Sequence, residues 1–142
     1  MDCMIEKYEI KESGYHPLLI SDGWQIAQLN YDINQKVENI MRLDIHNHTD
    51  EVFLLLKGRA VLITAKIDDN QPHFELEEMN HGVIYNVPRK TWHNIVMDKK
   101  CEVIIVEKSN THQNDFEFFQ LTEKNRQELR KRVDELMEIT KI

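Results

Sequence analysis

The chain has 142 residues, of which 41% are hydrophobic and 30% are charged, and its formal net charge is -7. This length suffices for one domain with a real core and is too short for two ordinary domains. Lys and Arg form no basic stripe, so the composition argues against nucleic acid or an anionic membrane as the main partner. A small-molecule ligand remains compatible, because one or two arginines are enough to hold even an anion.

Two cysteines, Cys3 and Cys101, are too few for a disulfide framework. Cys101 opens an apolar run over residues 103–106 and is expected to be a small buried residue. The first twenty residues lack the basic start and long apolar core of a signal peptide. No stretch approaches the roughly twenty apolar residues of a membrane span. We therefore expect a protein of the reducing cytoplasm.

The first forty-six residues contain turn signals at 13–14 and 21–23, and two predicted strands over 24–31 and 39–46. The second strand alternates between apolar and polar side chains. Its apolar set comprises Met41, Leu43 and Ile45, and its polar set comprises Arg42, Asp44 and His46. On this pattern alone, the apolar set would face the core and the polar set would face water.

The run from Val52 to Leu56 is apolar at every position, which predicts a strand covered on both faces, by a C-terminal helix or by another subunit. A turn at Lys57-Gly58 and a return strand over 59–67 predict a hairpin with this strand. Residues 68–72 form an exposed turn. Four more strands are predicted over 74–78, 83–87, 93–97 and 102–107.

The C-terminal segment changes to a helical period after Thr122, a plausible N-cap. One apolar stripe comprises Leu129, Val133, Leu136 and Met137. This helix is expected to pack on the outside of the strands or against a second subunit. Many short strands at this spacing are typical of a sandwich, a jelly roll or a closed barrel, so the fold class is mainly β with a C-terminal helix.

Candidate metal ligands gather in two segments at the ends of predicted strands. The first segment offers Asp44, His46, His48 and Glu51, and the second offers His93. Imidazoles mixed with carboxylates suit a divalent transition metal such as Fe, Mn, Ni or Zn, and the ligand set does not choose among them. Each residue also has an ordinary role, as a polar strand or turn residue with a hydrogen-bonded neighbour.

The same two segments resemble the motifs of the cupin superfamily. Glu51 followed by six residues and Gly58 is similar to the end of the first motif, which reads His-any-His, three or four residues, Glu, six residues, Gly. Gly82, five residues, Pro88 and then His93 five positions later resemble the second motif. The resemblance covers about residues 40–107 and implies a small single-domain cupin, a jelly-roll β-barrel. We expect an N-terminal arm over 1–38, a barrel core over 39–107, and a linker and helix over 108–142, all in one domain.

The chain departs from the motifs in several places. No glycine stands six residues before the first ligand, Lys90 occupies the position of a glycine in the second motif, and Met97 occupies that of an asparagine. The His-any-His pair is also displaced, which leaves two alignments open. Either the gap before Glu51 has shortened and His46 and His48 are ligands, or the gap is normal and Asp44 and His46 take those positions.

The resemblance also implies that the polar face of strand 39–46 points inward, against the preference of the pattern alone. Asp44 or His48, with His46, Glu51 and His93, would then hold a divalent metal, and Glu51 would move protons. Arg42 and Tyr85 are candidates for substrate contacts, although Arg42 could equally form an ion pair and Tyr85 could equally be packing.

Two functional hypotheses follow from the resemblance. One is a metal-dependent isomerase, lyase or oxygenase acting on a small polar metabolite, such as a sugar or an organic acid. The other is a non-catalytic ligand-binding or regulatory cupin with a degenerate metal site. In both cases the expected partners are a small molecule and a second copy of the chain in a homodimer.

Overall fold

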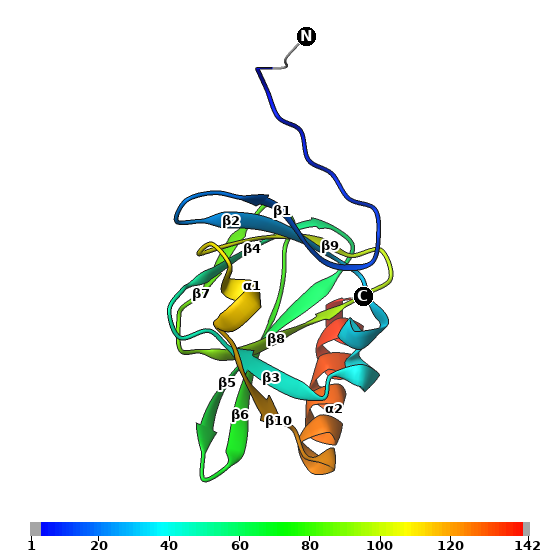
Figure 1. Cartoon of the computed structure of the whole chain (residues 1–142). Coiled ribbons are helices and arrows are strands. Elements are labelled where there is room, and N and C mark those ends of the chain that lie inside the picture. Colours follow the sequence, from blue (N-terminus) through cyan, green and yellow to red (C-terminus); the bar gives the residue numbers. More distant parts are fainter. Residues whose placement is uncertain (1–3, 141–142) are drawn as a thin grey trace.

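The computed structural model describes residues 4–140, which form two five-stranded antiparallel sheets and one long helix (Figure 1). The first sheet contains, in spatial order, β1 (Gly14–Ile20), β2 (Gln25–Asn30), β9 (Glu102–Glu107), β4 (Glu51–Lys57) and β7 (Ile84–Val87). The second contains β10 (Glu117–Gln120), β3 (Arg42–Ile45), β8 (Trp92–Met97), β5 (Ala60–Asp68) and β6 (Gln71–Glu78). The helices are α1 (Thr111–Asn114) and α2 (Glu123–Thr140), with short 3-10 turns at Ile33–Gln35 and Val37–Asn39.

This arrangement confirms the predicted jelly-roll class with a C-terminal helix. One detail of the prediction is corrected, because the described strands form two open sheets rather than one closed barrel. The inner faces of the sheets bury a common core, since alternate side chains along each strand point to the same face. Its largest members include Phe53, Leu55, Leu62, Ile95 and Ile105.

A second core fills the space between the outer face of the second sheet and α2. Leu43 and Ile63 of the sheet are fully buried there against Leu129 and Val133 of the helix. Burying a side chain of this size stabilises the fold by roughly 1.5–3 kcal/mol. Thr122 caps the helix, because its Oγ1 accepts the Asn125 N–H at 3.1 Å. The predicted helix and its apolar stripe are thereby confirmed.

The position of α2 explains the orientation of strand β3. Because the helix covers the outer face of the second sheet, Leu43 points outward into the second core. Arg42, Asp44 and the following His46 therefore point inward and line a cavity. The orientation implied by the cupin resemblance is confirmed, and the preference of the sequence pattern alone is wrong.

The predicted hairpin between the strands on either side of Gly58 is wrong. Strand β4 pairs with β7 and β9, whereas β5 pairs with β6 and β8, so the chain changes sheet at this turn. Gly58 has a φ of 77°. A Cβ added there would lie 2.7 Å from the backbone of Cys101, and only glycine fits that approach.

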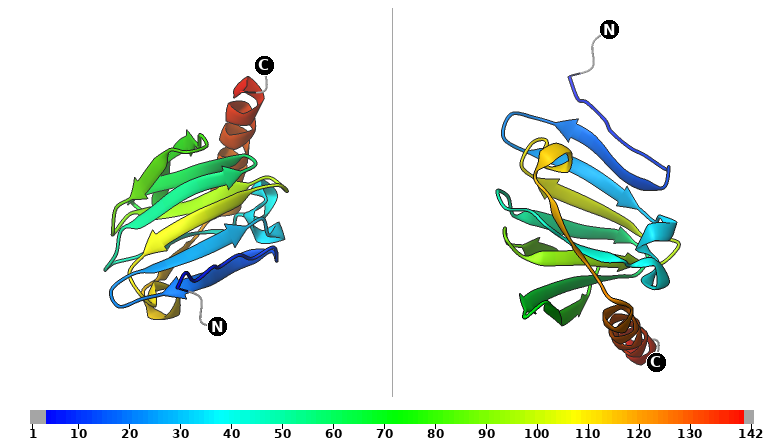
Figure 2. Two further views of the ribbon diagram at one scale, coloured as in Figure 1. Left: turned by 90° about the horizontal axis from the view of Figure 1, so that it is seen from above. Right: turned by 60° about the horizontal axis from the view of Figure 1, so that its bottom comes forward.

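Within the part of the chain that the structure describes, only the inner face of β4 is fully covered, so α2 does not cover the outer face, and its coverage by a second subunit stays a prediction. Phe53 and Leu55 are buried in the core, but Val52 and Leu54 are half-buried and Leu56 is exposed on the outer face. In both views of Figure 2, α2 lies beside the green strands of the second sheet, away from β1 and β2. No described helix is both long and apolar enough to cross a bilayer.

Candidate metal centre and cavity

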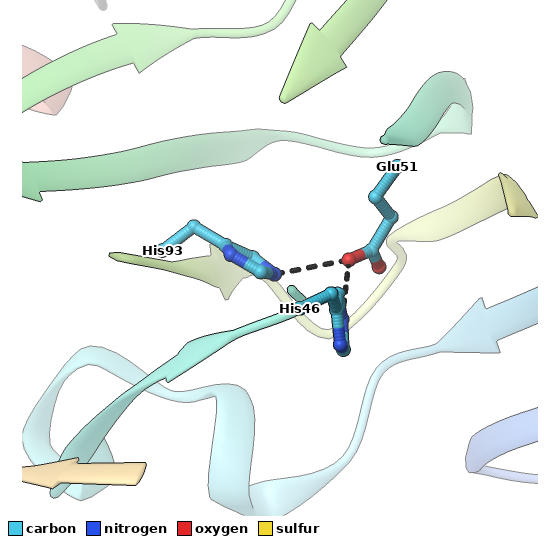
Figure 3. Close-up of side chains that lie close together, drawn as sticks. All are labelled: His46, Glu51 and His93. Carbon is cyan, nitrogen blue, oxygen red and sulfur yellow. Dashed lines mark ion pairs between the residues drawn. The ribbon is translucent and has the colours of Figure 1, made fainter. Parts of the chain in front are cut away.

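Three side chains from both sheets converge on one point (Figure 3). His46 follows the end of β3, Glu51 begins β4 and His93 lies in β8. Glu51 Oε2 lies 2.8 Å from His46 Nε2 and 3.0 Å from His93 Nε2. One candidate ligand atom from each residue lies within 4.8 Å of the others, so the group is compact enough to hold a metal ion.

Backbone carbonyls fix both imidazole rings. Asp115 O lies 2.6 Å from His46 Nδ1, and Thr91 O lies 2.9 Å from His93 Nδ1. Because a carbonyl oxygen can only accept, each Nδ1 carries the hydrogen. In a neutral ring, Nε2 then carries a free lone pair. In an imidazolium, Nε2 is the second protonated nitrogen. A ring that donates Nδ1–H to a carbonyl while Nε2 faces inward is the usual arrangement of a metal-ligating histidine.

The charges of the three groups depend on one another. Burial alone would lower the pKa of His46, but the hydrogen bond and ion pair with Glu51 outweigh burial and raise it to about 9. Burial would also lower the pKa of His93, but its hydrogen bond and ion pair with Glu51 again outweigh burial and raise it. Burial would raise the pKa of Glu51, whereas the two imidazoles hold it well below its usual range. Without another cation between them, both protonated rings pair with the single carboxylate of Glu51.

The donor set fits a divalent transition metal. Glu51 Oε2 is buried from solvent, and the two ring nitrogens lie within 3.0 Å of it. A metal displacing the two Nε2 protons would take two imidazoles and one carboxylate, the ligand types of Zn, Fe, Mn and Ni sites. Three protein ligands leave coordination positions open for water or a ligand.

The two alternatives for the remaining ligand occupy different places. Asp44 is the cross-strand partner of His93 and lies on the cavity wall, where burial raises the pKa of its carboxyl despite the opposing charges of His93 and Arg42. His48 is exposed, and only its backbone N–H is engaged, with Asp115 Oδ2 at 3.0 Å. The structure therefore brings Asp44, and not His48, to the wall beside the His46, Glu51 and His93 cluster.

This cluster lines a cavity of about 330 Å³ between the two sheets. Apolar walls come from Phe53 and Ile105, and the remaining polar lining includes Glu107 and Tyr15. Its size lies at the small end of the range for ligand sites. An apolar wall with a few converging polar groups is the usual composition of a small-molecule site.

No family model matches the chain, and no curated protein matches it. Three solved structures are similar. BH2720 from Bacillus halodurans is 16% identical, over 78% of this chain and 80% of that chain, with a TM-score of 0.57. The nucleoside dehydratase Pac13 from Streptomyces is 10% identical, over 85% and 96%, with a TM-score of 0.57. An RmlC-like cupin with a double-stranded β-helix fold from Methanocaldococcus jannaschii is 15% identical, over 79% and 97%, with a TM-score of 0.49.

The two facing antiparallel sheets, with the motif residues gathered at one cavity, decide the architecture. The chain has the cupin fold. At these levels of identity, the similarity concerns the fold alone.

Two departures of the chain from the cupin motifs now have a structural explanation. Lys90 takes the left-handed conformation that a glycine would adopt, with a φ of 62°, at a cost of about 1–2 kcal/mol for a side chain. Its N–H donates to His46 O at 2.7 Å and so supports the loop that carries His46. Met97 is buried in the core between the sheets, where an asparagine would need hydrogen-bond partners.

The two predicted substrate residues have different surroundings. Arg42 lines the cavity, stacks on Phe118 with its guanidinium carbon 3.6 Å from the ring centroid, and pairs with Asp44 at 3.4 Å. Tyr85 does not line this cavity. Tyr85 packs against the core between the two sheets, and its hydroxyl accepts the Asn80 N–H at 2.8 Å.

Sequence reasoning missed a further group of cavity residues. Tyr15, Glu107 and His112 line the cavity, and Gln25 contacts all three from behind. Glu107 could have been predicted, because alternate residues of β9 point inward and Glu107 follows Val103 and Ile105 in this alternation. Nothing in the sequence indicated that β1 and α1 would bring the other residues to it.

Proposed function

We propose that this cupin-fold protein binds a divalent transition metal through His46, Glu51 and His93 and uses the adjoining cavity for a small polar metabolite. One observation carries the proposal. Two Nε2 atoms and one carboxylate oxygen converge in a buried position, while both Nδ1 atoms donate to carbonyl groups. Such preset rings reduce the reorganisation needed for metal binding.

The proposed activity is metal-dependent isomerase, lyase or oxygenase chemistry. A metal held by His46, Glu51 and His93 would supply a Lewis acid beside the cavity. Glu51 holds the negative charge of the centre, and the second carboxylate, Glu107, lies on the same cavity wall with a raised pKa, caused first by burial and then by the charge of Glu51. A carboxyl group with a raised pKa exchanges a proton with a ligand more readily than an ordinary carboxylate. The nucleoside dehydratase Pac13, whose variants were solved with uridine, illustrates small-molecule chemistry on this fold.

A non-catalytic binding protein is the second candidate. It is favoured by the ion pairs inside the cluster, since both histidines can pair with Glu51 without any metal. A cavity held open by such an ion-pair cluster could bind a metabolite through its walls alone. This alternative predicts a fold and a thermal midpoint that do not respond to chelation.

Elemental analysis of protein purified without chelator separates the candidates. We expect close to one equivalent of Fe, Mn, Ni or Zn per chain. The His93→Ala variant should lose this metal, whereas His73→Ala, which removes an exposed histidine of β6, should retain it. A metal content unchanged in His93→Ala, or absent in the parent protein after incubation with each metal, would contradict the metal-dependent function.

The outer face of the first sheet supports a homodimer as part of this proposal. Register-matched aliphatic side chains cross four strands on this face: Ile26, Val106 and Val52 in one row, and Ile104, Leu54 and Ile84 in the next. Ile84 is 63% exposed. Lys57 and Glu102 lie beside these rows with opposite charges, so two copies related by a two-fold axis can present complementary surfaces to each other.

Sedimentation analysis tests this interface. We expect a dimer that Ile84→Lys converts to a monomer, because a buried lysine in an apolar interface is unfavourable. Ile33→Lys, at a position of similar exposure (60%) outside the face, should leave the dimer intact. A parent protein that sediments as a monomer would refute the homodimer.

A further inference from the structure

The cavity wall carries a second cluster of polar side chains, separate from the His46, Glu51 and His93 cluster. Tyr15 donates its hydroxyl to Glu107 Oε1 at 2.6 Å, and Gln25 Nε2 donates to the same oxygen at 3.1 Å. Glu107 is 6% exposed and Gln25 is fully buried. No residue that the structure describes bonds the other carboxyl oxygen, Glu107 Oε2. This oxygen is therefore available to a ligand in the cavity.

His112 belongs to the same cluster, through a hydrogen bond from Gln25 whose direction can be assigned. The Asn110 N–H donates to Gln25 Oε1 at 2.8 Å, which fixes the amide so that Nε2 faces Glu107 and His112 Nδ1, the latter at 3.1 Å. An amide NH₂ only donates, so His112 Nδ1 accepts and the ring hydrogen lies on Nε2. The wall therefore presents an acceptor from Glu107 and a donor from His112. A hydroxyl group, which both donates and accepts, matches this pair.

The cavity has little capacity for an anion. Its walls carry the carboxyl groups of Asp44, Glu51 and Glu107. The positive charges are already engaged, since both imidazoles pair with Glu51 and Arg42 pairs with Asp44.

Two aromatic rings extend the cavity wall at its exposed side. Phe116 and Phe118 are 41% and 47% exposed, with ring centroids 5.2 Å apart and planes tilted by 30°. Both line the cavity, and Phe118 lies opposite Asp44 in the sheet. Exposed aromatic faces beside a polar cavity are a mark of ligand contact. The apolar C–H face of a saturated ring packs well on such a surface.

We infer that the cavity binds a neutral, polyhydroxylated ring compound, a sugar or a simple glycoside, in preference to an organic acid. The hydroxyl groups bond Glu107, Tyr15 and His112, and the ring packs on Phe116 and Phe118. This inference rests on the proposed function, because it takes the cavity as the ligand site. It narrows the proposed small polar metabolite to a neutral sugar or glycoside, on the basis of the charge and the hydrogen-bonding pattern of the cavity walls.

The experiment compares ligands that differ only in charge. Methyl glycosides of glucose, galactose and mannose are titrated beside the corresponding methyl uronates into chelator-treated, ¹⁵N-labelled protein. Chelation ensures that a carboxylate cannot gain affinity through metal. The side-chain amide signal of Gln25 reports binding at the Glu107 wall. We expect at least one neutral glycoside to bind about tenfold more tightly than its uronate, because of the charge already on the walls.

Variants test whether Glu107 causes the preference for neutral glycosides. Glu107→Gln should reduce the ratio of glycoside affinity to uronate affinity, while Glu75→Gln, at an exposed position of β6, should leave it unchanged. Phe118→Leu should weaken both members of a pair to a similar extent, because stacking does not depend on charge. A uronate that binds as tightly as its glycoside, or no glycoside that moves the Gln25 signal, would overturn the inference. The metal content of His93→Ala is measured independently, so a failure of the proposed function is recognised separately.

Discussion

Replacing Glu51 by Gln tests the ionic description of the centre most directly. The variant keeps the shape of the side chain but removes the charge shared by His46 and His93. A pKa of His46 raised from 6.5 to about 9 is worth roughly 3 kcal/mol at 1.36 kcal/mol per pKa unit, and solvent screening in the open cavity reduces this to about 2 kcal/mol. We expect Glu51→Gln to lower the free energy of unfolding of chelated protein by about that amount.

The loss should depend on pH in a defined way. The contribution of His46, whose pKa is raised on folding, is complete below about 6.5 and disappears as the pH rises through about 9. The contribution of Glu51, whose pKa is lowered on folding, is present above its unfolded value of 4.5 and disappears as the pH falls through the lower folded value. The difference between parent and variant should therefore be largest between 4.5 and 6.5.

Urea unfolding at a series of pH values, in the presence of chelator, measures this difference. Glu77→Gln, at an exposed position of β6, is the matched control and should have little effect at any pH. A Glu51→Gln variant as stable as the parent protein, or a loss that is constant from pH 5 to pH 10, would refute the ion-pair description.

Three further changes test how the fold positions the site. Gly58→Ala should destabilise the protein by about 2–4 kcal/mol in thermal unfolding, because it combines a left-handed backbone with a backbone clash. Gly23→Ala shares the positive φ but has nothing within 4 Å of the added Cβ, so it should cost only about 1–2 kcal/mol; equal losses would show that the contact with Cys101 is unimportant. Leu129→Ala should cost about 2–5 kcal/mol in urea, because it opens a cavity under α2; a loss below about 1 kcal/mol would contradict the packing of this helix. Thr122→Ala should cost about 1 kcal/mol through loss of the N-cap, and Thr122→Ser should restore it.

The sequence predicted the architecture better than the course of the chain between the sheets. Alternation, turn residues and the helical stripe were enough for the strands from Arg42 to Glu107 and for α2. The same signals could not show that β4 and β5 lie in different sheets, because a turn at Gly58 is compatible with a hairpin and with a crossing. The close approach that requires glycine involves Cys101, which lies far away in sequence.

The site was predicted in part for a similar reason. Motif spacing selected His46, Glu51 and His93, which the structure brings together. It could not choose between Asp44 and His48, because that choice depends on which face of β3 the helix α2 covers. Glu107, Tyr15 and His112 were missed because they meet through β9, β1 and α1, and no local pattern records such a meeting. The cytoplasmic location and the domain limits remain predictions.

Asp115 joins the wall of the cavity to the metal-binding cluster. Its carbonyl accepts from His46, and its carboxylate accepts the backbone N–H groups of Asn47 and His48. The same segment carries His112 and Phe116 on the cavity wall. A movement of this segment that widened the entrance would have to release the His46 ring. Under the proposed function, entry of a ligand and retention of a metal would therefore be linked equilibria, each changing the affinity of the other by the same factor.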